Sequence, residues 1–261
     1  IGRLSSRFQK SYQNEIEYLK ILNKENNPNI INMIDNFVIE GRYFLVFEVF
    51  GKNLYQYLGN NHYKGLKIDI VEKFTYQLIN GLKLLKNIKL IHSDLKPENI
   101  LVSDTEDKIK IIDFGSSFYE KNGRYCNYIQ TRYYRSPEVL LGLPVTTNID
   151  IWSLGCIIYE MIRGYPLFKA KNYQDLFLYH TNLLGIPDSK IIKESQYGNK
   201  YIVKDNKNYK LLKNYDSKKI IFDPGTRFIE RHRNKENEKV FNILLKCLKW
   251  EPKKRLNLKN V

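Results

Sequence analysis

Two short segments carry the side chains best suited to chemistry: residues 92–99 read HSDLKPEN, and residues 113–115 read DFG. In the first segment, Asp94 can accept a proton from a hydroxyl group. Asn99 and, in the second segment, Asp113 offer the oxygen ligands that Mg²⁺ prefers. A carboxylate base together with two oxygen ligands for a metal ion is the minimum apparatus for moving a phosphoryl group from ATP to a protein side chain.

The alternative is that Asp94 and Asp113 are ordinary loop carboxylates, and for a single aspartate that reading would be preferred. The flanking sequence favours chemistry instead. Short strands are predicted at 90–91, 100–102 and 109–112. They place residues 94–99 in a loop and Asp113 just after the end of a strand. Two motifs with the right internal spacing are therefore joined by two short strands.

The rest of the chain divides into a strand-rich beginning and a mainly helical remainder. Helical periodicity over residues 9–23 puts Glu15 at the edge of an apolar stripe, where a carboxylate needs a cationic partner. Strand-like runs follow at 30–39 and 43–49, with a turn at 40–41 and a hinge-like break at 50–53. Helices are predicted over 70–85, 149–161 and 240–250, and residues 188–238 indicate an irregular polar insert with short elements.

Composition limits the class of protein. The 261 residues are 43% hydrophobic, enough for one sizeable core or two small lobes. No stretch approaches the roughly 18 uninterrupted apolar residues of a membrane span, so we expect no membrane partner. The three cysteines are far apart and suggest neither a metal site nor a disulfide framework. This fits a reducing compartment, and we expect the cytoplasm, the nucleus or both. We also expect a monomer.

The formal charge of +15 raises nucleic-acid binding as an alternative function. The basic residues are spread along the whole chain, however, and no nucleic-acid motif accompanies them. We therefore do not expect a nucleic-acid partner. Binding to duplex DNA that survives moderate salt would argue for this alternative.

Taken together, the motifs resemble the catalytic domain of a eukaryotic protein kinase, and the resemblance covers almost the whole chain. It implies an α+β, two-lobed protein-kinase fold. Residues 1–51 would form a partial β-rich N-lobe with helix C, and residues 52–261 a mainly helical C-lobe. In that family Asp94 would be the catalytic base and Lys96 would steady the transferring phosphoryl group. Asn99 and Asp113 would hold Mg²⁺ on ATP.

The resemblance also assigns residues on the N-lobe side. Glu15 would be the helix-C glutamate that pairs with a lysine and helps to bind ATP, although a solvated helical glutamate remains an alternative. Phe47 would guard the back of the adenine pocket. Backbone groups of Glu48, Val49 and Phe50 would form the hinge that binds adenine.

Two structural roles are implied for the C-lobe. Residues 136–138 (SPE) would end the activation segment, with Glu138 in a buried ion pair with Arg255; the alternative is that both are surface charges. Asp150 would begin the buried central helix and accept backbone hydrogen bonds from the loop that carries Asp94, because a carboxylate in an apolar helix needs such partners.

Within the kinases, the sequence resembles the dual-specificity tyrosine-regulated kinases of the CMGC group. The resemblance rests on residues 128–138 (YIQTRYYRSPE), 113–117 (DFGSS), 53–55 (NLY) and 224–227 (PGTR). It implies that the kinase phosphorylates its own Tyr128 and then serine and threonine residues of protein substrates.

Two arginines suit this self-phosphorylation. A phosphate on Tyr128 would add about −1.5 to −2 charge, which Arg132 and Arg135 could fold back to bind. The alternative is that Tyr128 is a plain packing tyrosine among 20 tyrosines. Ser93 stands where many kinases carry an arginine that binds an activation-loop phosphate. Because this arginine is absent, other cations must bind the phosphate, which again points to Arg132 and Arg135.

The glycine-rich phosphate loop and the strand lysine of the family have no counterpart, so we expect a chain that starts inside the N-lobe. If those elements lie upstream, a working kinase is predicted. If the chain is complete, the prediction is a catalytically impaired, kinase-shaped interaction module that binds ATP weakly.

Overall fold

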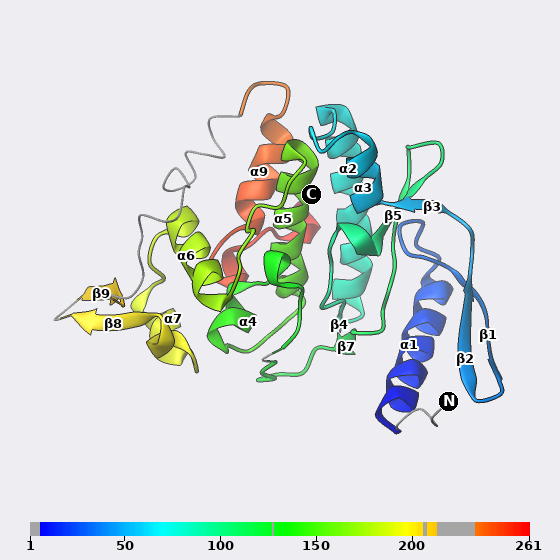
Figure 1. Cartoon of the computed structure of the whole chain (residues 1–261), viewed down its shortest axis with the longest axis horizontal. Coiled ribbons are helices and arrows are strands. Elements are labelled where there is room, and N and C mark those ends of the chain that lie inside the picture. The colour runs from blue at the N-terminus through cyan, green and yellow to red at the C-terminus, as the bar shows by residue number, and fades with distance from the viewer. Residues whose placement is uncertain (1–5, 127, 206–207, 213–232) are drawn as a thin grey trace.

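The computed structural model describes residues 6–126, 128–205, 208–212 and 233–261 (Figure 1). It begins with helix α1 (Ser6–Glu25) and an antiparallel hairpin of β1 (Met33–Ile39) and β2 (Arg42–Phe47). Glu40 and Gly41 make the hairpin turn with φ values of 49° and 74°. These elements agree with the predicted helix, two strands and turn. They lie at one end of the long axis, and the hairpin of β8 (Ile202–Asp205) and β9 (Asn208–Leu211) lies at the other (Figure 1).

Three short antiparallel strands connect the beginning of the chain to the helical body. The strands β3 (Gly51–Asn53), β5 (Ile100–Ser103) and β6 (Ile109–Ile111) form one sheet, and β4 (Leu90–Ile91) pairs with β7 (Phe118–Tyr119). A parallel bridge between Ile30 and Ile111 ties the segment before β1 to this sheet. The predicted hinge-like break at 50–53 is therefore displaced: residues 48–50 form the connection, and 51–53 pair with β5.

The helical body surrounds α5 (Asn148–Arg163), which is buried at every position from Ile149 to Met161. A helix that is apolar on all sides must be covered on all sides. It packs against α3 (Ile68–Asn87) and α9 (Glu238–Cys247), as Figure 1 shows. Helix α3 supplies an apolar stripe at Val71, Phe74, Leu78, Leu82 and Leu85. The three long helices predicted from periodicity are thus confirmed, with their ends shifted by a few residues.

Shorter elements complete the body. Helices α2 (Leu54–Asn60), α4 (Pro137–Leu141) and α6 (Tyr173–Leu184) were not singled out from the sequence. The single turns are η1 (Pro97–Asn99), η2 (Arg132–Tyr134), η5 (Pro252–Lys254) and η6 (Leu258–Asn260). The described part of the insert contains α7 (Ser189–Glu194), η3 (Gly198–Lys200), β8 (Ile202–Asp205) and β9 (Asn208–Leu211). Residues 224–227, quoted for the kinase resemblance, lie outside the described residues.

This architecture confirms the predicted α+β, two-lobed class, while the boundary between residues 51 and 52 stays a prediction. One main core joins side chains from α1 through η6, and a smaller one surrounds Ile91, Phe118 and Ile149. Within the described ranges, no helix has both the length and the apolar character needed to cross a membrane. All three cysteines are free, and Cys156 and Cys247 are buried.

Candidate active site

The loop that follows β4 is hydrogen-bonded to the first turn of α5. Both oxygens of the Asp150 carboxylate accept backbone hydrogen bonds, from the N–H of His92 at 2.8 Å and of Ser93 at 3.1 Å. Burial raises the pKa of Asp150 to about 6, against the opposing effect of His92 and of these two N–H groups. The structure confirms the role predicted for Asp150: it fixes the loop that leads into Asp94.

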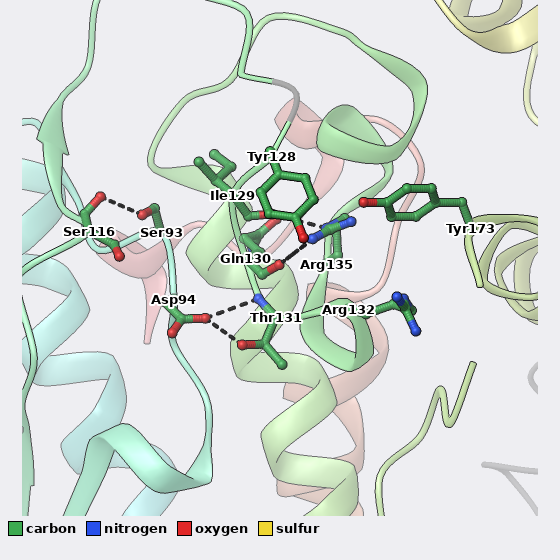
Figure 2. Close-up of a pocket in the computed structure, with 10 residues that line it drawn as sticks. All are labelled: Ser93, Asp94, Ser116, Tyr128, Ile129, Gln130, Thr131, Arg132, Arg135 and Tyr173. Carbon is green, nitrogen blue, oxygen red and sulfur yellow. Dashed lines mark hydrogen bonds between the residues drawn. The ribbon is translucent and has the colours of Figure 1, made fainter. Parts of the chain in front are cut away.

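Asp94 stands at the centre of a compact polar cluster. Its Oδ1 accepts hydrogen bonds from the Thr131 backbone N–H at 3.0 Å and the Thr131 hydroxyl at 2.7 Å (Figure 2). Lys96 Nζ lies 2.5 Å from its Oδ2. The Asn99 amide nitrogen donates to the Asp94 carbonyl oxygen at 2.9 Å. The three residues predicted for catalysis, Asp94, Lys96 and Asn99, therefore lie together, and Thr131 joins them from the activation segment.

Asp113 follows β6 in a left-handed backbone conformation, with φ of 65°. Its Oδ1 accepts the Gly115 backbone N–H at 3.4 Å. Among the described residues, no hydrogen bond joins the Asp113 carboxylate to Asp94 or Asn99. The two motifs meet through Ile112, whose N–H donates to the Asn99 carbonyl at 3.0 Å and whose carbonyl lies 2.9 Å from His92 Nε2.

One face of α1 covers the residues after Asp113. Ser11 donates its hydroxyl to the Gly115 carbonyl at 3.3 Å, and the Tyr18 ring meets Tyr119 edge-on at 5.3 Å. Between them lies Glu15, half-buried, with its carboxylate beside Asp113 and Gly115. Burial, and then the negative charge of Asp113, raises the pKa of Glu15 to about 6.

The cationic partner expected for Glu15 is missing from its surroundings, since no ion pair of Glu15 occurs within the part of the chain that the structure describes. Its assignment as a residue that helps to bind ATP stays a prediction. The carboxylate faces the segment that carries Asp113, as that assignment requires.

Residues 48–50 form the predicted hinge between β2 and β3. The Glu48 carboxylate accepts the Asn32 N–H at 2.8 Å and pairs with Lys110 at 2.6 Å. Val49 is 98% exposed, and the Phe50 ring lies 5.3 Å from Lys110 Nζ. The Glu48 side chain is thus used to fasten the connection to β6. The backbone role of residues 48–50 toward adenine stays a prediction, as does the guarding role of Phe47, which packs against the main core.

The activation segment closes one side of a cavity of about 360 Å³ (Figure 2). Its lining includes Asp94, Thr131, the three predicted regulatory residues Tyr128, Arg132 and Arg135, and residues that were not predicted: Ser116, Ile129, Gln130 and Tyr173. Tyr128 is 85% exposed.

The two arginines differ in what holds them. The Arg135 guanidinium donates to the carbonyls of Ile129 at 3.0 Å and Gln130 at 2.7 Å, and it lies 5.8 Å from the centre of the Tyr128 ring. Arg132 donates instead to the Lys171 carbonyl at 2.6 Å. Of the predicted pair, only Arg135 contacts Tyr128.

Ser93 and Gln130 connect the loop that carries Asp94 to neighbouring segments through hydrogen bonds between uncharged groups. Ser93 has φ of 67° and donates its hydroxyl to the Ser116 carbonyl at 2.7 Å, while its own carbonyl accepts the Gln130 N–H at 2.9 Å. The Gln130 side chain is buried and donates to Ser153 Oγ at 2.9 Å. Gln130 was missed from the sequence because nothing in its residue type signals a buried anchor.

The end of the activation segment is fixed as predicted. Arg255 donates to both carboxylate oxygens of Glu138, with Nη1 2.8 Å from Oε1, and both side chains are 0% exposed. Arg255 also donates to the Asn148 carbonyl at 2.8 Å. The structure therefore rules out the alternative that the two are surface charges.

A loop that carries an aspartate, a lysine and an asparagine, a second aspartate after a short strand, and a buried glutamate–arginine anchor define the catalytic core of a protein kinase. Residues 3–261 match the protein kinase domain family, and the chain belongs to that family.

Among curated proteins, three similar relatives agree with the finer resemblance. The chain is 38% identical to probable serine/threonine-protein kinase dyrk2 of Dictyostelium discoideum, over 98% of this chain and 28% of that protein. It is 36% identical to human dual specificity tyrosine-phosphorylation-regulated kinase 4, over 98% and 49%. It is 41% identical to the dual specificity protein kinase YAK1 of Saccharomyces cerevisiae, over 73% and 24%. The chain thus spans less than half the length of these relatives.

Proposed function

We propose that this chain catalyses the transfer of the γ-phosphoryl group of ATP to serine and threonine hydroxyls of proteins. The observation that carries the proposal is the cluster of Asp94, Lys96, Asn99 and Thr131 above the Asp150 anchor. The hydroxyl oxygen forms the new bond to phosphorus, the bond from phosphorus to the ADP oxygen breaks, and the hydroxyl proton passes to Asp94. Lys96 offsets negative charge on the phosphoryl group.

The donor set beside Asp94 fits Mg²⁺. The Asn99 amide nitrogen is turned to the Asp94 carbonyl, which leaves Oδ1 as its ligand atom. Asp113 adds carboxylate oxygens. Mg²⁺ is commonly held by one or two such groups together with substrate phosphates. When bound, it would neutralise phosphate charge. Asn99 and Asp113 are the residues that would hold it.

Two further groups would bind ATP in this proposal. The backbone of Glu48, Val49 and Phe50 would meet adenine, and the Glu48–Lys110 pair would keep that connection in place. Glu15 lies beside Asp113, so it could orient a cation toward the phosphates.

Tyr128 is the proposed site of autophosphorylation. Its exposure makes the hydroxyl accessible, and Arg135 already lies 5.8 Å from the ring centre. A phosphate would bring three acceptor oxygens next to that guanidinium. Arg132 would complete the site by exchanging the Lys171 carbonyl for the phosphate.

The protein would act on protein substrates as a monomer, in the cytoplasm or nucleus, where its three free cysteines stay reduced. Nucleic acid is not a proposed partner.

The test compares matched carboxylate-to-amide variants of the full-length protein on a generic basic protein with radiolabelled ATP. Asp94→Asn and Asp113→Asn should each lower the rate by about 10²- to 10⁴-fold. Asp104→Asn, on the exposed turn after β5, is the control and should retain the rate. Mass spectrometry should find phosphate on Tyr128 in the parent protein and none in Tyr128→Phe. Transfer that survives Asp94→Asn would overturn the proposal.

A further inference from the structure

The activation segment contains an exposed asparagine–glycine pair, Asn122 and Gly123. Together with Lys121 and Arg124 the pair makes a tight turn, closed by the Arg124 N–H, which donates to the Lys121 carbonyl at 3.1 Å. Gly123 has φ of 70°, a left-handed conformation that glycine adopts without steric cost. The proposed phosphoryl transfer uses none of these residues.

An asparagine that precedes a glycine can react with its own main chain. The Gly123 nitrogen would attack Cγ of the Asn122 side chain, and the bond from Cγ to Nδ2 would break. Nδ2 then leaves as ammonia, with the proton of the Gly123 N–H, and a cyclic imide remains. Water opens either imide carbonyl and yields aspartate or isoaspartate. A following glycine favours this attack because it has no side chain to shield its nitrogen.

The turn leaves both reacting groups accessible. Among the described residues, neither the Gly123 N–H nor the Asn122 side-chain amide makes a hydrogen bond. A Cβ atom added to Gly123 would have no neighbour within 4 Å, so the surroundings of its nitrogen are open. The turn itself is closed by a single main-chain hydrogen bond. Asn122 can therefore rotate toward the Gly123 nitrogen without disturbing the rest of the fold.

A second asparagine–glycine pair, Asn80 and Gly81, serves as an internal comparison. It lies inside α3, where each backbone N–H donates to the carbonyl four residues before it. Asn80 Nδ2 donates to Asn29 Oδ1 at 2.9 Å, and a Cβ on Gly81 would lie 2.9 Å from the Ile111 side chain. The same reaction at Asn80 would have to break helical and side-chain hydrogen bonds together.

We propose that Asn122 is a site of spontaneous deamidation, which converts it to aspartate or isoaspartate in the folded protein while Asn80 is preserved. The observation that carries the proposal is the contrast between an open turn and a helix around two identical pairs of residues. The inference goes beyond the proposed function and does not depend on it, because the reaction needs only water.

The modification would change how the activation segment is held. Aspartate would place a negative charge between two cations, Lys121 and Arg124. Isoaspartate would add one carbon to the main chain and so break the turn. Arg124 follows directly: its carbonyl accepts the Val145 N–H at 2.9 Å, and its guanidinium lies 4.0 Å from the centre of the Phe118 ring. Both contacts should loosen as the protein ages.

Hydroxylamine provides the first test, because it attacks the cyclic imide and cleaves the chain between the asparagine and the glycine. In the folded full-length protein, peptide mapping should find cleavage between residues 122 and 123 at a rate at least about tenfold higher than between residues 80 and 81. The control is the protein in guanidinium chloride, where the two pairs should be cleaved alike. Equal rates in the folded protein, or no cleavage after Asn122, would overturn the proposal.

Ageing at neutral pH provides the second test. Chromatography with mass spectrometry should find aspartate and isoaspartate accumulating at position 122 of the parent protein and not at position 80. Asn122→Gln should stay unmodified, because glutamine would need a larger ring, whereas the control Asn80→Gln should leave the reaction at 122 unchanged. Intact Asn122 in the aged parent would refute the site.

Two further measurements separate this proposal from the kinase function. Asp94→Asn should deamidate at Asn122 as fast as the parent, and a slower reaction would mean that phosphoryl transfer is involved after all. Hydrogen exchange in the peptide that contains Val145 should become faster in the aged parent and not in aged Asn122→Gln. Equal exchange in the two proteins would refute the loosening of the activation segment.

Discussion

The two sides of the candidate active site differ in how their buried charges are compensated. On the α5 side, the Asp150 carboxylate accepts two backbone hydrogen bonds, and Glu138 is paired in full with Arg255. On the α1 side, the Glu15 carboxylate has one backbone hydrogen bond, from Phe114, but it sits next to a like charge, Asp113, with no cation among the described residues. The first arrangement holds a loop in place, whereas the second leaves a charge that the fold must carry at a cost.

The largest effect should come from breaking the α5 side. Arg255→Met leaves the Glu138 carboxylate buried and unpaired, and should lower the free energy of unfolding by about 3–5 kcal/mol. Urea denaturation at neutral pH measures this. The control is Arg233→Met, which breaks an exposed pair with Glu238 of 2.6 Å and should cost at most about 1 kcal/mol. Similar losses in both variants would erase the distinction between compensated burial and surface pairing.

The second prediction concerns a buried titratable side chain, His180, that lacks hydrogen-bond partners among the described residues. His180 is buried against Trp152 and Phe168, and neither ring nitrogen has a hydrogen-bond partner among the described residues. Burial, and then the charge of Arg255, lowers the pKa of His180 to about 3. The unfolded chain binds a proton at His180 below pH 6.5, whereas the folded protein does so only near pH 3. The free energy of unfolding is therefore unaffected by His180 above pH 6.5, and it falls by about 1.4 kcal/mol per pH unit as pH drops from 6.5 toward 3.

His180→Leu should remove this loss. Relative to the parent, the variant should gain about 2 kcal/mol between pH 8 and pH 5, as measured by denaturation at both values. Asp150 and Glu160, with pKa values raised to about 6 and about 7, act in the opposite direction, but they cancel in the difference because both proteins contain them. His62→Asn, at an exposed histidine, is the control. If the stability difference between His180→Leu and the parent does not change with pH, a hydrogen-bond partner must compensate the buried His180 ring.

The smallest effect concerns the α1 side and has the reverse sign. The pKa of Glu15 is raised from 4.5 to about 6, so its penalty is absent below pH 4.5 and complete above pH 6. Glu15→Gln should therefore stabilise this chain by about 1 kcal/mol at pH 7.5, and by nothing at pH 4. Glu17→Gln, on the exposed face of α1, is the matched control. Destabilisation by Glu15→Gln at pH 7.5 would show that the carboxylate has a cation after all.

The sequence predicted the long elements and the charged anchors well, because each leaves a periodic or spacing signal. Helix α5 was recognisable from its apolar run, and Asp150 because a carboxylate there demands donors. The pairing of Glu138 with Arg255 came only from the family resemblance, since no local pattern links residues so far apart.

Short elements and neutral contacts escaped the sequence for physical reasons. Helices of five to twelve residues such as α4 and α6 contain too few turns for a clear period. Strand β3 depends on pairing with β5, which no local pattern reports. Gln130 and Tyr173 line the cavity beside Asp94 through positions set by the tertiary fold. Arg132 donates to the Lys171 carbonyl and lies 5.7 Å from the Tyr173 ring of α6, contacts that no local pattern reports, and its role with Arg135 toward a phosphate stays a prediction.

Ser93 joins the catalytic loop to the stretch after Asp113 with an uncharged hydroxyl that donates to a carbonyl. Mobile ions screen charge pairs, and they have little hold on a contact between two neutral dipoles. The hydrogen bond between Ser93 and Ser116 should therefore be equally strong at low and at high salt concentration. The contact of Arg132 and Arg135 with a phosphate on Tyr128, by contrast, would weaken as ionic strength rises.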